Sequence, residues 1–268
     1  MEEISVVLSG SRVQFTLEEP FLEEELKMST RALLVSAFVL LVVLLTGPLG
    51  YKYGLVELQP SLSSLLIAVV GGLLVVLAGL VYLIIAVKVA LPRNRNLIAL
   101  AMAIGLLPLI IMLPQMSKAR IVPPIHDITT DTDNPPEFVA LKTVREYAPN
   151  GFEYGASDAW PAEKLGAVTR EAYPDLQPIT SALSVAEAVD RSEVVLTEMG
   201  LEIAESDPVS GRVEATATTY WFGFKDDVIV RVAPYDDGSM IDLRSMSRVG
   251  QSDIGANADR IRDFIARF

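Results

Sequence analysis

Three long apolar runs in the first half of the chain constrain its fold more than any other feature. They cover about residues 32–50, 65–87 and 97–113, and none of them contains a charged side chain. An α-helix rises 1.5 Å per residue, so about 20 residues cross a hydrocarbon core of about 30 Å. A buried core helix normally keeps a polar stripe and is seldom apolar over such a length. The sequence therefore predicts three transmembrane helices.

The basic residues that flank these runs predict an orientation. Those that precede the first run or lie between the second and third runs are Lys27, Arg31, Lys88, Arg93 and Arg95. The loop between the first two runs, residues 51–64, has Lys52 as its one basic residue, and the segment after the third run has Lys118 and Arg120. The positive-inside rule then predicts a cytoplasmic N-terminus, and an odd number of spans carries everything after Met116 to the opposite side.

Charge and hydropathy divide the chain into three predicted parts. Residues 1–27 carry seven acidic and two basic side chains and form an acidic tail, or an over-extended start before Met28. Residues 28–116 form the three-span domain, and residues 117–268 form an extracytoplasmic domain. From residue 121 onward the chain has 26 acidic and 13 basic side chains. A surface this acidic predicts no nucleic-acid partner, because phosphate binding needs basic residues.

The chain has no cysteine, and His126 is its single histidine. This composition excludes disulfides, thiol catalysis, zinc fingers, iron–sulfur clusters and sites built from several histidines. Accordingly, we expect neither a metal nor a cofactor.

The C-terminal part has the local patterns of an α+β domain. Ser184 and Glu187 form a capping-box signature before a helix that Gly200 ends, and a last helix is expected over about residues 253–267. Short helical turns are expected near residues 161–168, and a helix through Phe138, Leu141 and Val144. Four strands are expected over residues 201–206, 212–219, 228–233 and 239–245. The prediction is an antiparallel sheet of about four strands covered by helices.

Two segments of this part form a specific motif. The first is Asp127–Pro136, which is rich in Asp, Thr and Pro, and the second is R-S-x-S-R-x-G-x-S-D-x-G-x-N-x-x-R-I at Arg244–Ile261. Together they resemble the domain-of-unknown-function family number 1499 over about residues 121–268. The resemblance implies an uncharacterised extracytoplasmic domain, and some bacterial members also have three preceding spans. It supplies no reaction and no catalytic residues. The combined expectation is a multi-pass protein of the bacterial inner membrane with a periplasmic C-terminal domain.

The motif also suggests an anion site. Its arginines are expected near the N-terminus of the last helix, where free backbone amides bind anions. The candidate ligand-binding residues are Arg244, Ser245, Ser247, Arg248, Ser252, Asn257 and Arg260. The alternative is that the arginines pair with Asp242, Asp253 and acids upstream, and so tie the N-terminal arm of the domain to the sheet. The acidity of the domain favours this alternative.

Three further patterns carry weaker signals. His126 and Asp127 suggest a triad with Ser245 or Ser247, but the chain lacks a G-x-S-x-G elbow. Oxygen ligands for calcium occur at Asp127, Asp131, Asp133 and Asn134, but not at the spacing of a calcium loop, and Asx-turns explain them equally well. The aromatic patch at Trp221, Phe222 and Phe224 is consistent with core packing, or with contact to a partner or the membrane surface.

The leading functional hypothesis is a non-catalytic membrane protein. Its outward-facing domain would bind a partner protein, or help to assemble a membrane complex, beside the lipid bilayer. Small residues at Ala68, Gly72 and Gly79 share one helix face and suit either self-association or packing among the protein's own spans. No charged side chain lies within a predicted span, which disfavours a pump or channel. The alternative hypothesis is a domain that binds or processes an anionic small molecule or lipid headgroup at Arg244, Arg248 and the start of the last helix.

Overall fold

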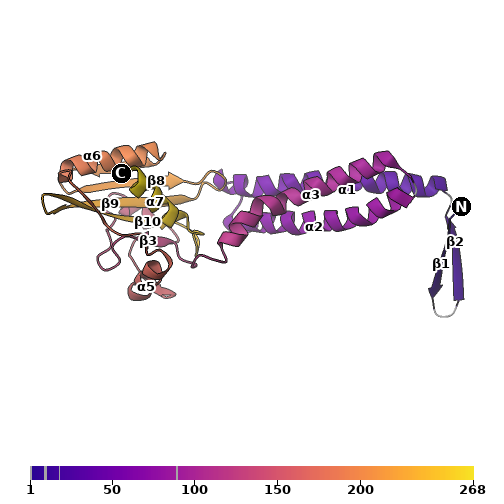
Figure 1. The fold of residues 1–268 in the computed structure, drawn as a ribbon, viewed down its shortest axis with the longest axis horizontal. Helices are drawn as coiled ribbons and strands as arrows, with labels where there is room; N and C mark the ends of the chain where they lie inside the picture. The colour runs from indigo at the N-terminus through magenta and orange to yellow at the C-terminus, as the bar shows by residue number, and fades with distance from the viewer. Residues whose placement is uncertain (1, 9–10, 18, 89) are drawn as a thin grey trace. The chain divides into compact units, whose positions relative to one another are not determined.

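The computed structural model describes residues 2–8, 11–17, 19–88 and 90–268, with side chains from residue 24 onward except at 89, 92 and 93. The chain divides into two compact units, Met1–Pro114 and Gln115–Phe268. Figure 1 shows long helices in the first unit and a sheet with helices in the second. The fold class is α+β, as the sequence predicted.

The first unit contains the three predicted membrane helices. They are α1 (Glu19–Lys52), α2 (Leu58–Lys88) and α3 (Pro92–Lys118), and each includes a stretch long and apolar enough to cross a bilayer. The chain is therefore a membrane protein. The helices extend beyond the apolar runs at both ends, because polar residues at the edge of a span continue the helix into the headgroup region. The acidic tail, for which the sequence predicted no element, includes an antiparallel hairpin of β1 (Glu2–Leu8) and β2 (Ser11–Leu17).

Small residues bring α2 and α3 into close contact within the first unit. A Cβ atom added at Gly72 would lie 2.2 Å from the backbone oxygen of Gly105, and one at Gly79 would meet the side chain of Met102. Ala68 and Ala101 are fully buried. The small-residue face of the second span therefore packs against the protein's own third span.

The second unit is built on one sheet in which all strands pair antiparallel. The four long strands are adjacent in the order β7 (Glu202–Asp207), β8 (Arg212–Thr218), β9 (Lys225–Tyr235) and β10 (Gly238–Ser247). Two short strands, β3 (Asp127–Thr129) and β6 (Ile179–Ser181), share the free edge of β10. The sheet thus has six strands, not about four as predicted. The two additional strands are three residues long, too short to display an alternating pattern.

One face of the sheet carries the hydrophobic core. The helices α6 (Val185–Glu198) and α7 (Ala256–Arg267) pack on it, and Leu165 of α5 (Ala162–Ala172) joins the same core. The capping box of Ser184 and Glu187 is present in full, and Gly200 has the left-handed φ of +80° that ends α6. The last helix begins at Ala256, three residues later than expected.

The opposite face of the sheet is covered by residues 130–157, which we call the strap. The strap contains α4 (Lys142–Arg145), and the hairpin of β4 (Ala156–Ser157) and β5 (Trp160–Pro161) begins at its end. The helix predicted through Phe138 and Leu141 is wrong except for α4. The backbone amides of Val139, Ala140 and Leu141 instead donate to the buried carboxylate of Glu214, at 2.7, 3.0 and 2.9 Å. A strand side chain therefore takes the place of helical carbonyl acceptors.

Candidate functional site

The first motif arginine, Arg244, ties the strap to the sheet. Its side chain is buried and makes a two-point ion pair with Asp127, with Nε–Oδ1 and Nη2–Oδ2 both at 2.9 Å. It also donates to the backbone oxygens of Pro136 and Phe152, at 3.1 and 3.0 Å. The rings of Phe138 and Tyr154 flank the guanidinium, with centroids 5.2 and 5.4 Å from Cζ. This set of contacts holds the charge of Arg244 in a dry, fully partnered environment.

The second motif arginine, Arg248, shares one carboxylate with a residue that the sequence analysis did not single out. Its Nε and Nη2 lie 2.8 Å from the two oxygens of Asp227, and Nη1 of Arg145 lies 2.6 Å from Oδ2. Thr216 donates to Oδ1 at 2.7 Å. Burial alone would raise the pKa of Asp227, but the hydrogen bonds from Arg248 and Thr216 and the nearby arginine charges outweigh it and hold the pKa below its usual value. Asp227 is therefore an ionised group at the centre of the strap's anchorage.

The third arginine belongs to a separate network on the core face of the sheet. Nη2 of Arg260 pairs with Asp226 at 2.7 Å, and its Nη1 donates to Oγ of Ser245 at 2.9 Å. The Ser245 hydroxyl donates to Oδ1 of Asn257 at 2.7 Å, and Nδ2 of Asn257 donates to Oγ of Ser247 at 3.0 Å. These polar groups satisfy one another where α7 begins to cross the end of β10.

The backbone amides at the start of α7 are also in use. Asp253 accepts from the amides of Gly255 and Asn257, at 2.7 and 2.9 Å, and Oγ of Ser252 accepts from the amide of Ile254 at 3.2 Å. Burial raises the pKa of Asp253 above its usual value, and these hydrogen bonds counteract the rise only in part. A carboxylate of the chain itself thus occupies the position proposed for an anionic ligand.

The candidate ligand-binding residues consequently do not form one site. Ser252 accepts from the amide of Ile254 before α7, and the other six fall into two groups. Ser245, Ser247, Asn257 and Arg260 come together on the core face, whereas Arg244 and Arg248 lie on the strap face. The reason is the strand period of two, which turns neighbouring residues of β10 to opposite sides. Of the acids named as alternative partners, Asp242 pairs with Arg231 and Asp253 accepts from amides at the start of α7, whereas the upstream acid Asp127 does pair with Arg244.

Sequence reasoning missed the acidic partners Asp226 and Asp227. A detectable signal existed, because two adjacent aspartates at the start of a strand must place one carboxylate on each face. Recognising it required starting the strand at Lys225 rather than at Val228. Arg145 gave no such signal, since a single arginine near a helical pattern is normally solvent-exposed.

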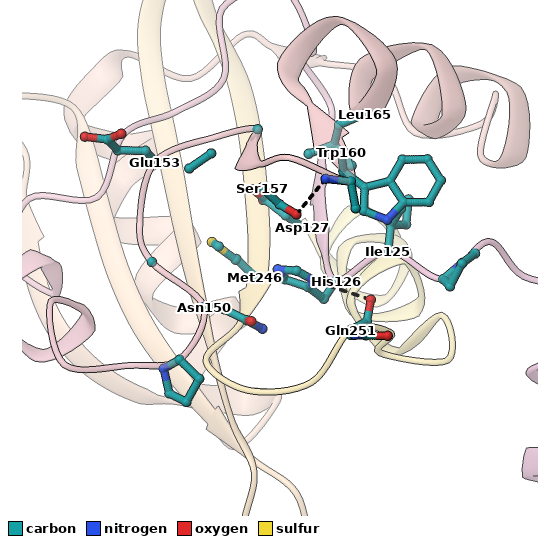
Figure 2. A pocket seen from close by; sticks show the side chains of 16 residues that line it. Ile125, His126, Asp127, Asn150, Glu153, Ser157, Trp160, Leu165, Met246 and Gln251 are labelled. Atoms are coloured by element: carbon teal, nitrogen blue, oxygen red, sulfur yellow. Dashed lines mark hydrogen bonds between the residues drawn. The ribbon is translucent and has the colours of Figure 1, made fainter.

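A cavity of about 480 Å³ opens beside the single histidine. Its lining residues include His126, Asn150, Ser157, Trp160 and Gln251, drawn in Figure 2 with eleven others. Nδ1 of His126 lies 3.4 Å from the backbone oxygen of Gln251, and Oγ of Ser157 accepts from the amide of Ala159 at 3.3 Å. Nδ2 of Asn150 donates to the backbone oxygens of Ser247 and Gly250, at 3.1 and 2.8 Å. This volume lies in the range of small-ligand sites, and an indole wall with neighbouring amide groups suits a peptide or a neutral ligand.

The side chains near the cavity do not form a catalytic triad. Both carboxylate oxygens of Asp127 are engaged by Arg244, and the hydroxyls of Ser245 and Ser247 are bound to Asn257. In the part of the chain whose side chains are described, no group of three or more His, Asp or Glu residues is placed to hold a metal ion.

The proposed calcium ligands form a turn instead of a site. The carboxylate of Asp131 accepts from the amides of Asp133 and Asn134, at 3.2 and 2.9 Å, and its second oxygen pairs with Arg231 at 2.8 Å. This is the Asx-turn that the sequence left open as the alternative.

The aromatic patch lies in the loop of residues 219–224 between β8 and β9. The rings of Phe222 and Phe224 stack with centroids 4.7 Å apart, and Trp221 meets Tyr220 edge to face at 6.2 Å. Tyr220 and Trp221 are exposed, by 81% and 43% respectively. The patch therefore has a stacked base and an exposed tip.

Comparison with known proteins identifies a family. The family model described as "Protein of unknown function (DUF1499)" matches residues 127–268, which is more than half of the chain and nearly all of the second unit. No curated protein and no solved structure matches the chain.

Proposed function

We propose that this chain, which belongs to the DUF1499 family, is a non-catalytic assembly module of the bacterial inner membrane. The three spans hold the second unit at the periplasmic face, with the N-terminus in the cytoplasm. The supporting pattern is the excess of basic residues before the first span and between the second and third. There the domain binds a segment of a membrane-protein partner.

The observation that carries this proposal is the internal neutralisation of the family motif. Each motif arginine is paired with a carboxylate of the chain itself: Arg244 with Asp127, Arg248 with Asp227 and Arg260 with Asp226. The motif thus builds a rigid domain in which the strap is fixed to the sheet. For the same reason the anion-binding alternative receives less support, because a ligand would have to displace buried ion pairs at a cost of several kcal/mol.

The cavity beside His126 is the surface that suits a partner. Trp160 forms one wall, and tryptophan is enriched among residues that dominate binding energy at protein interfaces. Gln251 supplies an uncharged side-chain amide, which matches the backbone of an extended peptide, whereas Nδ2 of Asn150 already donates to the backbone oxygens of Ser247 and Gly250. Glu153 lies across the cavity from Trp160 and points away from it (Figure 2).

A crosslinking experiment on the full chain in its native membrane tests the proposal. A photoreactive residue at Ala159, in the lining of the cavity, should give a discrete adduct with one protein. The same residue at Val209, which is 98% exposed on a far turn, should not give that adduct. The substitution Ala156→Glu, which places a charge in the cavity, should remove the adduct, whereas the matched change Ala186→Glu on the exposed surface of α6 should retain it.

Two results would contradict the proposal. The absence of any cavity-specific adduct would refute partner binding at this surface. A reporter enzyme fused after Phe268 that proves active only in the cytosol would refute the topology.

A further inference from the structure

We propose that the aromatic loop of residues 219–224 rests in the headgroup region of the bilayer and thereby fixes the orientation of the second unit. The partner in this interaction is a lipid surface. The inference rests on the proposed topology only for the choice of leaflet. It goes beyond partner binding because it assigns a separate surface, made of residues that do not line the cavity, to the membrane.

The register of the sheet places the aromatic loop at the same end of the sheet as the chain that arrives from α3. Thr218 pairs with Lys225, Ser247 pairs with Asp226, and Met246 pairs with Asp127. The end of β8, the start of β9, the end of β10 and the start of β3 therefore lie side by side at one end of the sheet. The aromatic loop extends from this end, which we call the proximal end, and the chain also arrives here from α3.

The last residue of α3 and the segment that follows it are attached to the start of α7. Lys118, which ends α3, forms an ion pair with Asp259 in the first turn of α7. A Cβ atom added at Gly255 would lie 3.4 Å from Val122, so the connecting segment packs directly on the start of α7. Lys118 follows the last apolar residue of the third run, Leu113, by five residues, or about 7.5 Å of helix. This is about the depth of the headgroup layer on one side of a bilayer.

The residue types at the tip of the loop suit a membrane interface. Its backbone is closed by hydrogen bonds of Thr219 with Phe224 and Gly223, at 2.8 and 3.0 Å. Its tip exposes Tyr220 and Trp221. Tyrosine and tryptophan concentrate at membrane interfaces because their rings are apolar while their OH and NH groups remain hydrated. A loop that is already ordered loses little conformational freedom on binding.

The two ends of the sheet differ in charge. The proximal segments 115–126 and 219–225 contain Lys118, Arg120 and Lys225 and no acidic residue. The turns at the opposite end, residues 207–211 and 235–238, contain three aspartates and no basic residue. The charge of Lys118 is paired with Asp259, so Arg120 and Lys225 are the basic residues of these segments that favour an anionic lipid surface there.

The two tryptophans of the chain permit a direct test. Trp160→Phe leaves Trp221 in the loop as the sole indole, and Trp221→Phe leaves Trp160 in the cavity wall. Each full-length variant is placed in vesicles of phosphatidylcholine and phosphatidylglycerol that contain a lipid with a quencher near its headgroup. We expect the lipid quenching constant of Trp221 to exceed that of Trp160 by about twofold or more. Equal or weaker quenching of Trp221 would overturn the proposal.

A pair of tyrosine variants tests whether the loop itself makes the contact. In the Trp160→Phe background, Tyr220→Ser at the loop tip should reduce the lipid quenching of Trp221. Tyr235→Ser, at an exposed tyrosine of the opposite end, should leave it unchanged. Equal effects of the two variants would contradict an anchoring role.

The outcome separates this inference from the proposed function. The vesicles contain only the purified chain. If the loop binds a protein partner and not lipid in the native membrane, Trp221 should therefore remain unquenched in these vesicles. Conversely, an error in the predicted topology is detected by the reporter behind Phe268 and does not alter the quenching.

Discussion

Removing the charge of Asp227 should destabilise the second unit far more than removing an exposed aspartate. Asp227→Asn leaves the guanidinium of Arg145, which is completely buried, without its carboxylate. Arg248 is partly exposed and is able to turn toward solvent. Breaking one partner of a buried ion pair costs about 3–5 kcal/mol. For a unit of this size, each kcal/mol lowers Tm by about 2–4 °C, so we expect a decrease of roughly 6–20 °C.

The matched control is Asp175→Asn. Asp175 forms a two-point pair with Arg262, but both side chains are more than a third exposed. An exposed pair contributes about 1 kcal/mol or less, so its loss should lower Tm by no more than about 4 °C. The contrast between the two Asp→Asn changes therefore isolates the effect of burial.

Thermal melting of the purified full chain, followed by tryptophan fluorescence, provides the assay. Both tryptophans lie in the second unit, so their emission reports its unfolding separately from the spans. The double variant Arg145→Met with Asp227→Leu should recover part of the loss, because it removes the buried guanidinium together with the carboxylate and so leaves no unpaired charge at position 145. If Asp227→Asn lowers Tm no more than Asp175→Asn does, the buried network does not anchor the strap.

Three further predictions follow from individual contacts. The pKa of Asp227 is lowered in the folded state, so its contribution to stability is complete above its unfolded pKa of about 3.9 and is lost as the pH falls through the lower folded value; an acid titration of Tm should show this slope, and Asp227→Asn should lack it. Ser184→Ala removes the capping hydroxyl of α6 and should cost about 1 kcal/mol in urea unfolding, whereas Ser184→Thr should keep most of it. Gly72→Ile should separate α2 from α3, because its Cβ would meet the carbonyl oxygen of Gly105. The chain has no cysteine of its own, so a cysteine introduced on each helix reports the separation, and disulfide crosslinking of the pair should decrease.

The spans, the long strands and the flanking helices were predictable because each of them is specified locally. Hydropathy identifies the spans, the alternation of Val213 and Ala215 with polar residues identifies β8, and the capping box at Ser184 identifies the start of α6. These signals depend on neighbours only a few positions away, and tertiary structure did not override them.

The strap was not predictable because its structure depends on contacts with distant residues. Glu214, on β8, binds three consecutive amides of the strap, and Asp127 and Asp227 select Arg244, Arg248 and Arg145 as partners. Nothing in the local sequence distinguishes these charges from solvated ones. The polar residues on this side of the sheet therefore do not indicate its burial, although the structure buries Glu214, Asp227 and Arg244.

The division of the candidate ligand-binding residues between two faces has the same origin. The spacing in the motif places its arginines close together along the chain, but adjacent strand positions point in opposite directions. Arg244 and Ser245 are neighbours in sequence and belong to different networks. Sequence proximity within a strand thus overestimated how many of these groups share one site.

The arrangement of β3 and β6 on the free edge of β10 has a consequence for biogenesis. Asp127 and its partner Arg244 lie 117 positions apart, so the segment that leaves the third span waits for nearly the whole domain to be synthesised before it can pair with β10. Contacts of such long range make folding slow, and they leave an unpaired edge open to aggregation meanwhile. A cell that makes this protein would therefore depend on chaperones during the interval between synthesis of the second unit and closure of the sheet.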